Sequence, residues 1–114
     1  MSDLNRVQLL GRVGARPELK TGKSGHEWTE VAVATNTVVP GVDGAPPEER
    51  TEWHRVKFFG RTAVNCAEHL DKGRDVYVEG RLQMRKWTDK DGQDRFEREV
   101  VGRRIDFIGS RRAA

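Results

Sequence analysis

The chain has 114 residues, of which 34% are charged and 35% hydrophobic, with a formal net charge of +3 and an isoelectric point near 9.4. This length supplies one domain without room for a separate catalytic module, and the small core expected for so polar a protomer favours an oligomer. Residues 1–60 hold eight Lys and Arg against eight acids, and residues 61–114 hold thirteen against ten, which weakly favours a polyanionic partner.

Alternating apolar residues predict two strands in the first third of the chain. The first runs from Asn5 to Gly14, the second is centred on residues 31–35, and a turn at residues 21–25 separates them. The inward-facing side chains of these strands are Val7, Leu9, Val13, Val31, Val33 and Thr35. Residues 36–50 contain three prolines and two glycines without periodicity, and they predict a long mobile loop.

The segment Thr51–Gly60 predicts a third strand whose two faces differ in chemistry, because successive side chains of a strand point to opposite sides. One face carries Trp53, Arg55, Lys57 and Phe59. The opposite face carries His54, Val56 and Phe58. Aromatic rings can stack on unpaired bases while neighbouring cations reach the linking phosphates, so the first face suits single-stranded nucleic acid.

A segment from Asp75 to Trp87 repeats this alternation. Its even positions predict a core face, Val76, Val78, Leu82 and Met84, interrupted by Gly80. Its odd positions are Tyr77, Arg81, Arg85 and Trp87, and Lys86 lies at the strand end. Tryptophans of small β-proteins are usually core residues and strand cations usually a solvated face, but two strands with the same pairing favour a binding surface.

Residues 61–70 lie between these two strands and have helical spacing. The helix places Cys66, the single cysteine, among apolar neighbours, which predicts a buried thiol and excludes an internal disulfide. A hairpin tip at residues 89–92 and a strand over about 95–108 complete the chain. This order predicts an all-β fold with one helix, an OB-fold five-stranded Greek-key barrel with the helix between strands 3 and 4. We expect the domain to span residues 1–110, with residues 111–114 as a short basic remnant.

Three patterns resemble catalytic or metal sites without meeting their requirements. Gly22-Lys23-Ser24 copies the end of a phosphate-binding loop, but Pro17 stands where that motif needs glycine. The acids around Gly92 lack calcium-loop spacing, so we expect a hairpin turn there. The three histidines are far apart in the sequence, which predicts neither a zinc site nor a catalytic triad. The chain also lacks an apolar membrane-spanning segment and a secretion signal, and we expect a cytoplasmic location.

Eight motifs, in order over residues 4–109, carry a resemblance to a known family. They are Asn5-Arg6-Val7 with Gly11 and Gly14, Val33-Ala34-Thr35, Thr51-Glu52-Trp53-His54-Arg55, Phe59-Gly60, Lys72-Gly73, Val76-Tyr77-Val78-Glu79-Gly80, Arg85-Lys86-Trp87-Thr88-Asp89 and Gly92-Gln93-Asp94-Arg95. Together they closely resemble bacterial single-stranded DNA-binding protein (SSB). The resemblance implies an OB fold, a homotetramer, association with the nucleoid, and neither cofactor nor catalysis. It also implies sequence-nonspecific protection of single-stranded DNA during replication, repair or recombination.

The resemblance also assigns roles by position. It implies base stacking on Trp53, Phe59 and Trp87. It implies phosphate contacts from Arg61, Lys72, Arg85 and Lys86, to which strand parity adds Arg55, Lys57 and Arg81. It places His54 near a subunit contact and the first strand, with Val7 and Leu9, in a dimer contact.

The chain departs from the family pattern at three places. Val38-Val39 stands where many members have an aromatic residue, so one stacking position is lost. Trp28, at a position that is often small or branched, predicts an extra core or loop-packing aromatic. The sequence ends in Ser110-Arg111-Arg112-Ala113-Ala114 rather than in an acidic tip, by truncation or by nature, so we expect no tail-dependent protein partners.

The alternatives to a single-stranded DNA-binding protein that coats DNA are a primosomal or competence-type SSB paralogue, an RNA-binding OB module, a protein-recruiting adaptor and a small enzyme. Competition between single-stranded DNA and RNA separates a DNA-binding from an RNA-binding module.

Overall fold

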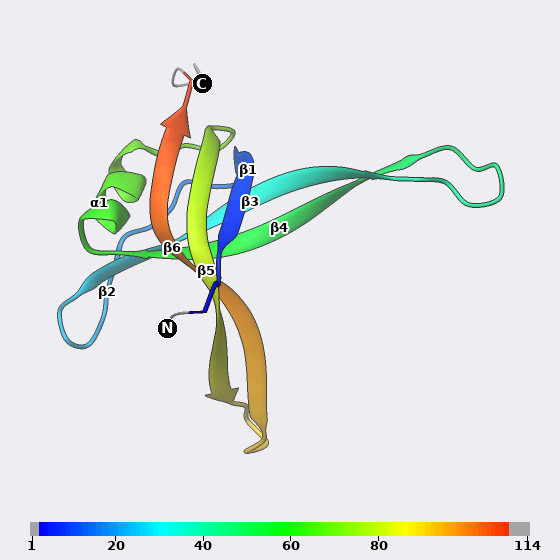
Figure 1. Cartoon of the computed structure of the whole chain (residues 1–114). Coiled ribbons are helices and arrows are strands. Elements are labelled where there is room, and N and C mark those ends of the chain that lie inside the picture. The colour runs from blue at the N-terminus through cyan, green and yellow to red at the C-terminus, as the bar shows by residue number, and fades with distance from the viewer. Residues whose placement is uncertain (1–2, 110–114) are drawn as a thin grey trace.

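The computed structural model describes residues 3–109, and the basic remnant expected at residues 111–114 lies outside the described residues. Its elements are β1 (Val7–Val13), β2 (Lys20–Thr21), β3 (Glu27–Val39), β4 (Glu48–Phe59), α1 (Gly60–His69), β5 (Asp75–Thr88) and β6 (Asp94–Ile108) (Figure 1). The strands follow the order β1-β5-β6-β4-β3-β2, and β1 also pairs with β3. Five strands therefore form a closed barrel, which confirms the predicted OB-type fold, and the short β2 extends the sheet beyond β3.

The barrel is filled from the inward-facing side chains of its strands. Most neighbouring strands are antiparallel, whereas β4 and β6 run parallel where Val56 pairs with Val100. The fully enclosed side chains, each with 0% exposure, include Val31, Val33, Val56, Phe58, Val76 and Val78. These are alternate residues of β3, β4 and β5, as the period of a strand predicts for a sheet with one buried face.

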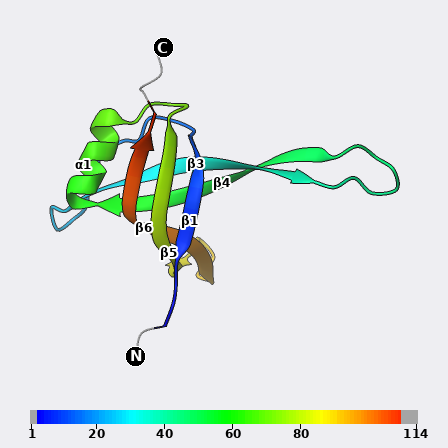
Figure 2. The ribbon, with the colours of Figure 1, turned by 45° about the horizontal axis from the view of Figure 1, so that its top comes forward.

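The helix α1 lies at one end of the barrel, away from the long β3–β4 hairpin (Figures 1 and 2). It begins directly after β4, where Gly60 has a positive φ of 63° that a residue with a side chain rarely adopts. Its buried residues are Ala63 and Cys66, and the backbone N–H of Leu70 donates a 3.0 Å hydrogen bond to the carbonyl of Cys66. Cys66 is fully enclosed, which confirms the prediction of a buried thiol, and burial raises its pKa to about 12.

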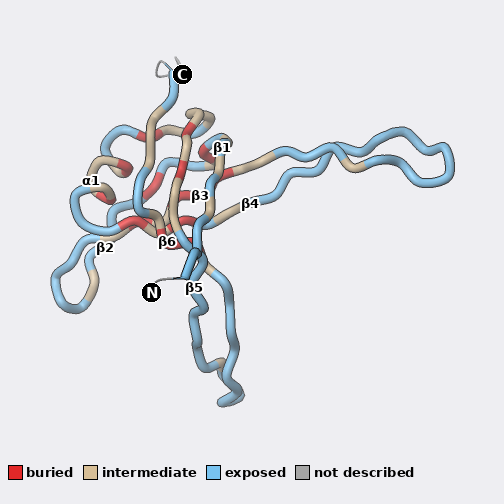
Figure 3. Tube along the Cα trace, in the orientation of Figure 1, coloured by how far each residue is buried: buried red, intermediate tan, exposed pale blue. Residues whose placement is uncertain are grey.

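Two hairpins extend from the barrel as arms, and both correct the sequence-based expectations. In the β3–β4 arm the strands remain paired from Asn36 with Thr51 as far as Val39 with Glu48. Only residues 40–47 are irregular, so the predicted loop over residues 36–50 was too long. The arm is largely exposed (Figure 3), and backbone pairing without a buried face leaves no hydrophobic alternation in the sequence.

The β5–β6 arm begins at an irregular register between Glu79 and Gly80. Beyond this point the hairpin leaves the barrel and no layer covers it (Figure 1). Leu82 and Met84 are consequently 42% and 55% exposed, and the prediction that they continue the core face was wrong. Strand parity shows which side chains share a face, but burial also requires a second layer against that face.

The segments that resembled other sites are turns. Residues 22–26 connect β2 to β3, with no helix after Ser24, so a phosphate-binding loop is excluded there. The carboxylate of Asp89 accepts hydrogen bonds of 2.9 Å from the backbone N–H groups of Asp91 and Gln93, as the predicted hairpin tip requires. Within residues 3–109 the acids, histidines and cysteine form no metal-binding cluster, and no helix there is long and apolar enough to span a membrane.

Candidate nucleic-acid interface

The outward face of β4 forms the floor of the candidate site. Val56 and Phe58 point into the core, so the opposite face of the strand carries Trp53, Arg55, Lys57 and Phe59. Trp53 is 60% exposed and Phe59 is 47% exposed, values that are high for aromatic side chains. The neighbouring β3 places small residues beside this row, since Ala34 pairs with Trp53 and Ala32 with Arg55. Because the alanine side chains are short, the larger side chains of β4 protrude beyond the neighbouring strand.

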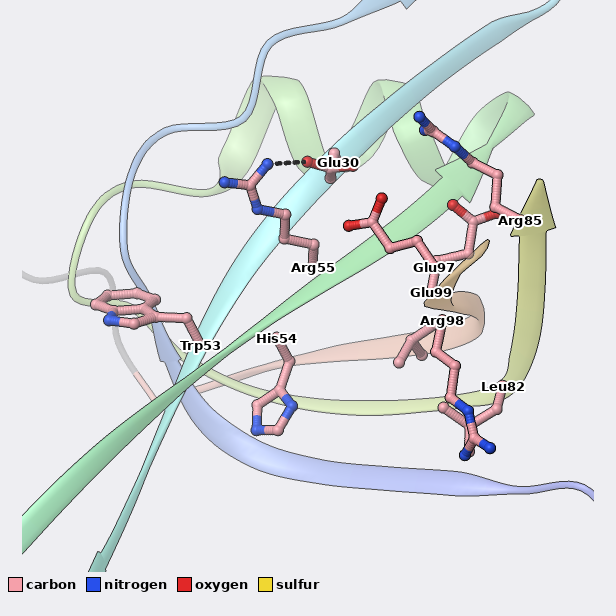
Figure 4. A pocket seen from close by; sticks show the side chains of 10 residues that line it. Glu30, Trp53, His54, Arg55, Leu82, Arg85, Glu97, Arg98 and Glu99 are labelled. Carbon is pink, nitrogen blue, oxygen red and sulfur yellow. Dashed lines mark ion pairs between the residues drawn. The ribbon is translucent and has the colours of Figure 1, made fainter. Parts of the chain in front are cut away.

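A cavity of about 460 Å³ lies between this face and the root of the β5–β6 arm. Trp53 and Arg55 enter it from β4, Arg85 from β5 and Arg98 from β6 (Figure 4). The acids Glu30, Glu97 and Glu99 also line it. The cavity thus combines one exposed indole ring with three guanidinium groups and an equal number of carboxylates.

Two of the expected phosphate-contacting cations on β4 are held by acids. Arg55 lies 3.5 Å from Glu30, yet its side chain remains 77% exposed. Lys57 lies 3.1 Å from Glu99, and both side chains are mostly enclosed, at 17% and 14% exposure. Arg55 can therefore exchange its partner for a phosphate easily, whereas Lys57 must first leave an enclosed ion pair.

The β5 arm carries the other members of the expected site. Arg85 faces Glu97 across the β5–β6 ladder and forms no ion pair within the part of the chain described. Lys86 lies 3.4 Å from Asp94, and both side chains are largely exposed. Trp87, which is 41% exposed, pairs with Arg95 near the tip of the arm. The arm therefore continues the mixture of rings and cations away from the barrel.

Several expected site residues lie outside the cavity. Phe59 is six positions after Trp53, about 20 Å away along an extended strand. Arg61 is in the first turn of α1, and Lys72 lies in the α1–β5 connection. Arg81 follows the irregular register and donates a 3.3 Å hydrogen bond to Gln83. The structure thus gathers Trp53, Arg55 and Arg85, and it distributes the others along a longer surface.

The three residues expected at subunit contacts have partners within the protomer. The ring nitrogen Nε2 of His54 lies 2.9 Å from the hydroxyl of Thr35. Val7 and Leu9 are half-buried against the barrel core. Leu10, on the opposite face of β1 from Val7 and Leu9, is 68% exposed, so the strand presents an apolar side chain outward as well as inward.

Two residues of this surface were not anticipated from the sequence. Arg98 shares strand parity with the core residue Val100, and only the departure of the arm from the barrel exposes it to the cavity. Trp28 is half-buried and lies directly across from Phe59, on the outward face of the sheet. Of the two expected positions for Trp28, in the core or packed against a loop, the core position was therefore wrong. The sequence did contain a signal for the outward position of Trp28. The alternation with Thr29 and Val31 places Trp28 on the face opposite to the core.

Comparisons with known proteins agree with this geometry. Residues 4–108 match the single-strand binding protein family. The chain is 40% identical over 111 residues to single-stranded DNA-binding protein 1 of Xylella fastidiosa strain 9a5c, covering 97% of the chain and 82% of that protein. It is also 40% identical over 108 residues to single-stranded DNA-binding protein of strain Temecula1, covering 95% of the chain and 65% of that protein.

A solved structure of the same architecture is the Plasmodium falciparum SSB complex with ssDNA. It superposes with a TM-score of 0.83 at 29% identity, over 96% of this chain and 98% of that one. Sequence and fold therefore agree over almost the entire described chain, and the protein belongs to the single-strand binding protein family.

Proposed function

We propose that this protein binds and protects single-stranded DNA with little sequence preference. The observation that carries the proposal is the cavity beside β4, which is lined by the exposed ring of Trp53 and by Arg55, Arg85 and Arg98, together with three glutamates. Unpaired bases offer a flat surface to an exposed aromatic ring, and the linking phosphates offer negative charge to the guanidinium groups. The family membership and the named relatives support the same ligand, and a binding role without catalysis.

The mechanism combines two individually weak contributions. Base stacking on Trp53, Phe59 and Trp87 contributes roughly 1–3 kcal/mol for each ring, independently of base identity. Phosphate contacts from Arg55, Arg85 and Lys86 release counterions, and Arg61, Lys72 and Arg81 extend the cationic path around the barrel. Lys57 contributes only if its pair with Glu99 opens. Duplex DNA buries its base faces, so it offers only the phosphate contribution.

We propose a homotetramer as the functional assembly, with β1 at one subunit contact. Within the described residues β1 pairs with β5 over Val7–Arg12 but meets β3 only at Arg12 and Val13. One backbone edge of β1 is therefore open over most of its length, beside the exposed side chain of Leu10. An open edge of this kind favours pairing with a second strand, and a second copy of β1 fits it. Light scattering at micromolar concentration distinguishes this assembly from a monomer.

The proposed cellular role follows from the proposed ligand, single-stranded DNA. We propose that the protein acts in the cytoplasm, at the nucleoid, on single strands exposed during replication, repair or recombination. The sequence-tolerant stacking surface suits such strands because their base composition varies.

The test compares the affinities for labelled oligo-dT, mixed-sequence single-stranded DNA, single-stranded RNA and duplex DNA. We expect tight binding to both DNA single strands and weak binding to the duplex, with the Trp53→Ala and Trp87→Ala variants weakened but folded. Equal affinity for duplex DNA contradicts the stacking mechanism. Preferential binding of RNA in direct competition contradicts the assignment to DNA.

A further inference from the structure

Three side chains form a row across the sheet at the end of β4. Lys20 of β2 pairs with Trp28 of β3, and Trp28 in turn pairs with Phe59 of β4. Directly opposed residues of antiparallel strands share a face and have Cβ atoms roughly 5 Å apart. The elements that carry the row meet next to α1 (Figure 1). Lys20, Trp28 and Phe59 therefore define one continuous surface, which we call the Trp28 row.

The ring of Trp28 is placed at the surface rather than in the core. Its neighbour Thr29 is 0% exposed and points inward, so Trp28 points outward and is only half-buried. Two ammonium groups cover it, with Lys20 Nζ 4.9 Å and Lys57 Nζ 5.4 Å from the ring centroid. Contacts of this kind at exposed sites are weak, so a stacking base can replace a flexible lysine over the ring.

The two lysines differ in how firmly they are held. Lys57 is enclosed and paired with Glu99 at 3.1 Å, so it remains beside the ring as a fixed positive charge. Lys20 is exposed and forms no ion pair with a carboxylate in residues 3–109. When a base displaces Lys20 from the Trp28 ring, the ammonium group of this flexible lysine can turn to the adjoining phosphate. The Trp28 row thus offers an aromatic ring for the base of a nucleotide and a cation for its phosphate.

We propose that Trp28 is a base-stacking residue, which receives the base next to the one on Phe59, while Lys20 contacts the adjoining phosphate on the side of Trp28 away from Phe59. This inference rests on the proposed function and extends the DNA path from β4 across β3 onto β2. It assigns to Trp28 a role that replaces, at a different place, the aromatic residue missing at Val38 and Val39 in the β3–β4 arm.

The first experiment measures affinity for labelled oligo-dT with the Trp28→Ala, Trp28→Phe and Lys20→Ala variants of the full chain. Because one stacked base is lost, the affinity of Trp28→Ala for oligo-dT is expected to fall by roughly fivefold to 150-fold, whereas Trp28→Phe retains most of the affinity. For Lys20→Ala, the slope of the logarithm of the binding constant against the logarithm of the salt concentration should be shallower by about 0.7. This is the contribution of one phosphate of a single strand. His69→Ala, an exposed ring on α1, is the matched control and should bind like the unmodified protein.

The second experiment separates stacking from a purely structural role. The tryptophan emission lost on saturation with oligo-dT is compared between the unmodified protein and Trp28→Phe, which keeps an aromatic ring and does not depend on the folding of the alanine variant. A stacked Trp28 makes this loss larger in the unmodified protein. Equal losses, or a folded Trp28→Ala that binds as tightly as the unmodified protein, overturn the inference. If the unmodified protein itself fails to bind oligo-dT, the proposed function is wrong as well.

Discussion

The indole ring of Trp53 lies against the backbone of Gly14, in the space that any other residue would fill with its side chain. A Cβ atom added at Gly14 would lie 2.7 Å from the Cη2 atom of the ring and closer still to Cζ3. The glycine, in the segment just after β1, therefore supports the position of the exposed ring of Trp53 on β4, to which we assign base stacking. It links the barrel backbone directly to the proposed binding surface.

The Gly14→Ala variant should bind oligo-dT more weakly because the added methyl group displaces the Trp53 ring. We expect roughly a threefold to tenfold loss, less than the removal of a complete stacking residue. The fold should persist, since Trp53 is 60% exposed and can move into solvent. Fluorescence titration and thermal unfolding measure the two properties. Gly14→Val should have a larger effect, and unchanged affinity in both variants contradicts the supporting role.

Removing the carboxylate of Glu30 should strengthen DNA binding at low salt. Glu30 pairs with Arg55 at 3.5 Å and lines the cavity, so it competes with phosphate for that guanidinium. We expect Glu30→Gln to bind oligo-dT roughly twofold to fivefold more tightly at about 0.05 M salt, with the difference vanishing near about 1 M. Glu27→Gln, an exposed acid at the start of the same strand, is the control. A gain that persists at high salt argues against an electrostatic cause.

The carboxylate of Asp89 should keep the tip of the β5–β6 arm ordered in mild acid. Its hydrogen bonds from the Arg95 side chain and from the backbone of Gln93 and Asp91 hold its pKa below the ordinary value. Since the folded pKa is the lower one, this stabilisation is complete above the unfolded pKa of about 3.9 and is lost as the pH falls through the folded value.

Amide hydrogen exchange and carboxyl NMR titration measure this effect. Asp89→Ala should accelerate exchange at Gln93 at neutral pH, and Asp91→Ala, which leaves the accepting carboxylate in place, should not. A titration midpoint of Asp89 at or above 3.9 contradicts the pKa direction.

Cys66 should resist thiol reagents while the protein is folded. Its side chain is 0% exposed and its pKa is raised to about 12, so at pH 8 almost all of it is a protonated, enclosed thiol. Since the thiolate is the reactive form, Ellman's reagent should react only when the protein unfolds. The reaction rate in increasing urea provides the measurement. Rapid reaction in the absence of urea contradicts the enclosed position.

The sequence by itself determined which residues share a face. A strand alternates with period two wherever it lies, so the sequence predicted that Trp53, Arg55 and Phe59 face away from Val56 and Phe58. Helical spacing likewise placed Cys66 in a buried position, and the order of the elements predicted the barrel. These features depend on local geometry, which the chain carries in its own periodicity.

The tertiary structure decided what covers each face and which strands become neighbours. Leu82 and Arg98 both follow core parity, yet both are exposed because the β5–β6 arm leaves the barrel after Gly80. Trp28 meets Phe59 only through the antiparallel register of β3 and β4, which joins residues far apart in the sequence. The cover over a face and the register between strands result from contacts between distant segments, so no local pattern could show that Leu82 is exposed or that Trp28 meets Phe59.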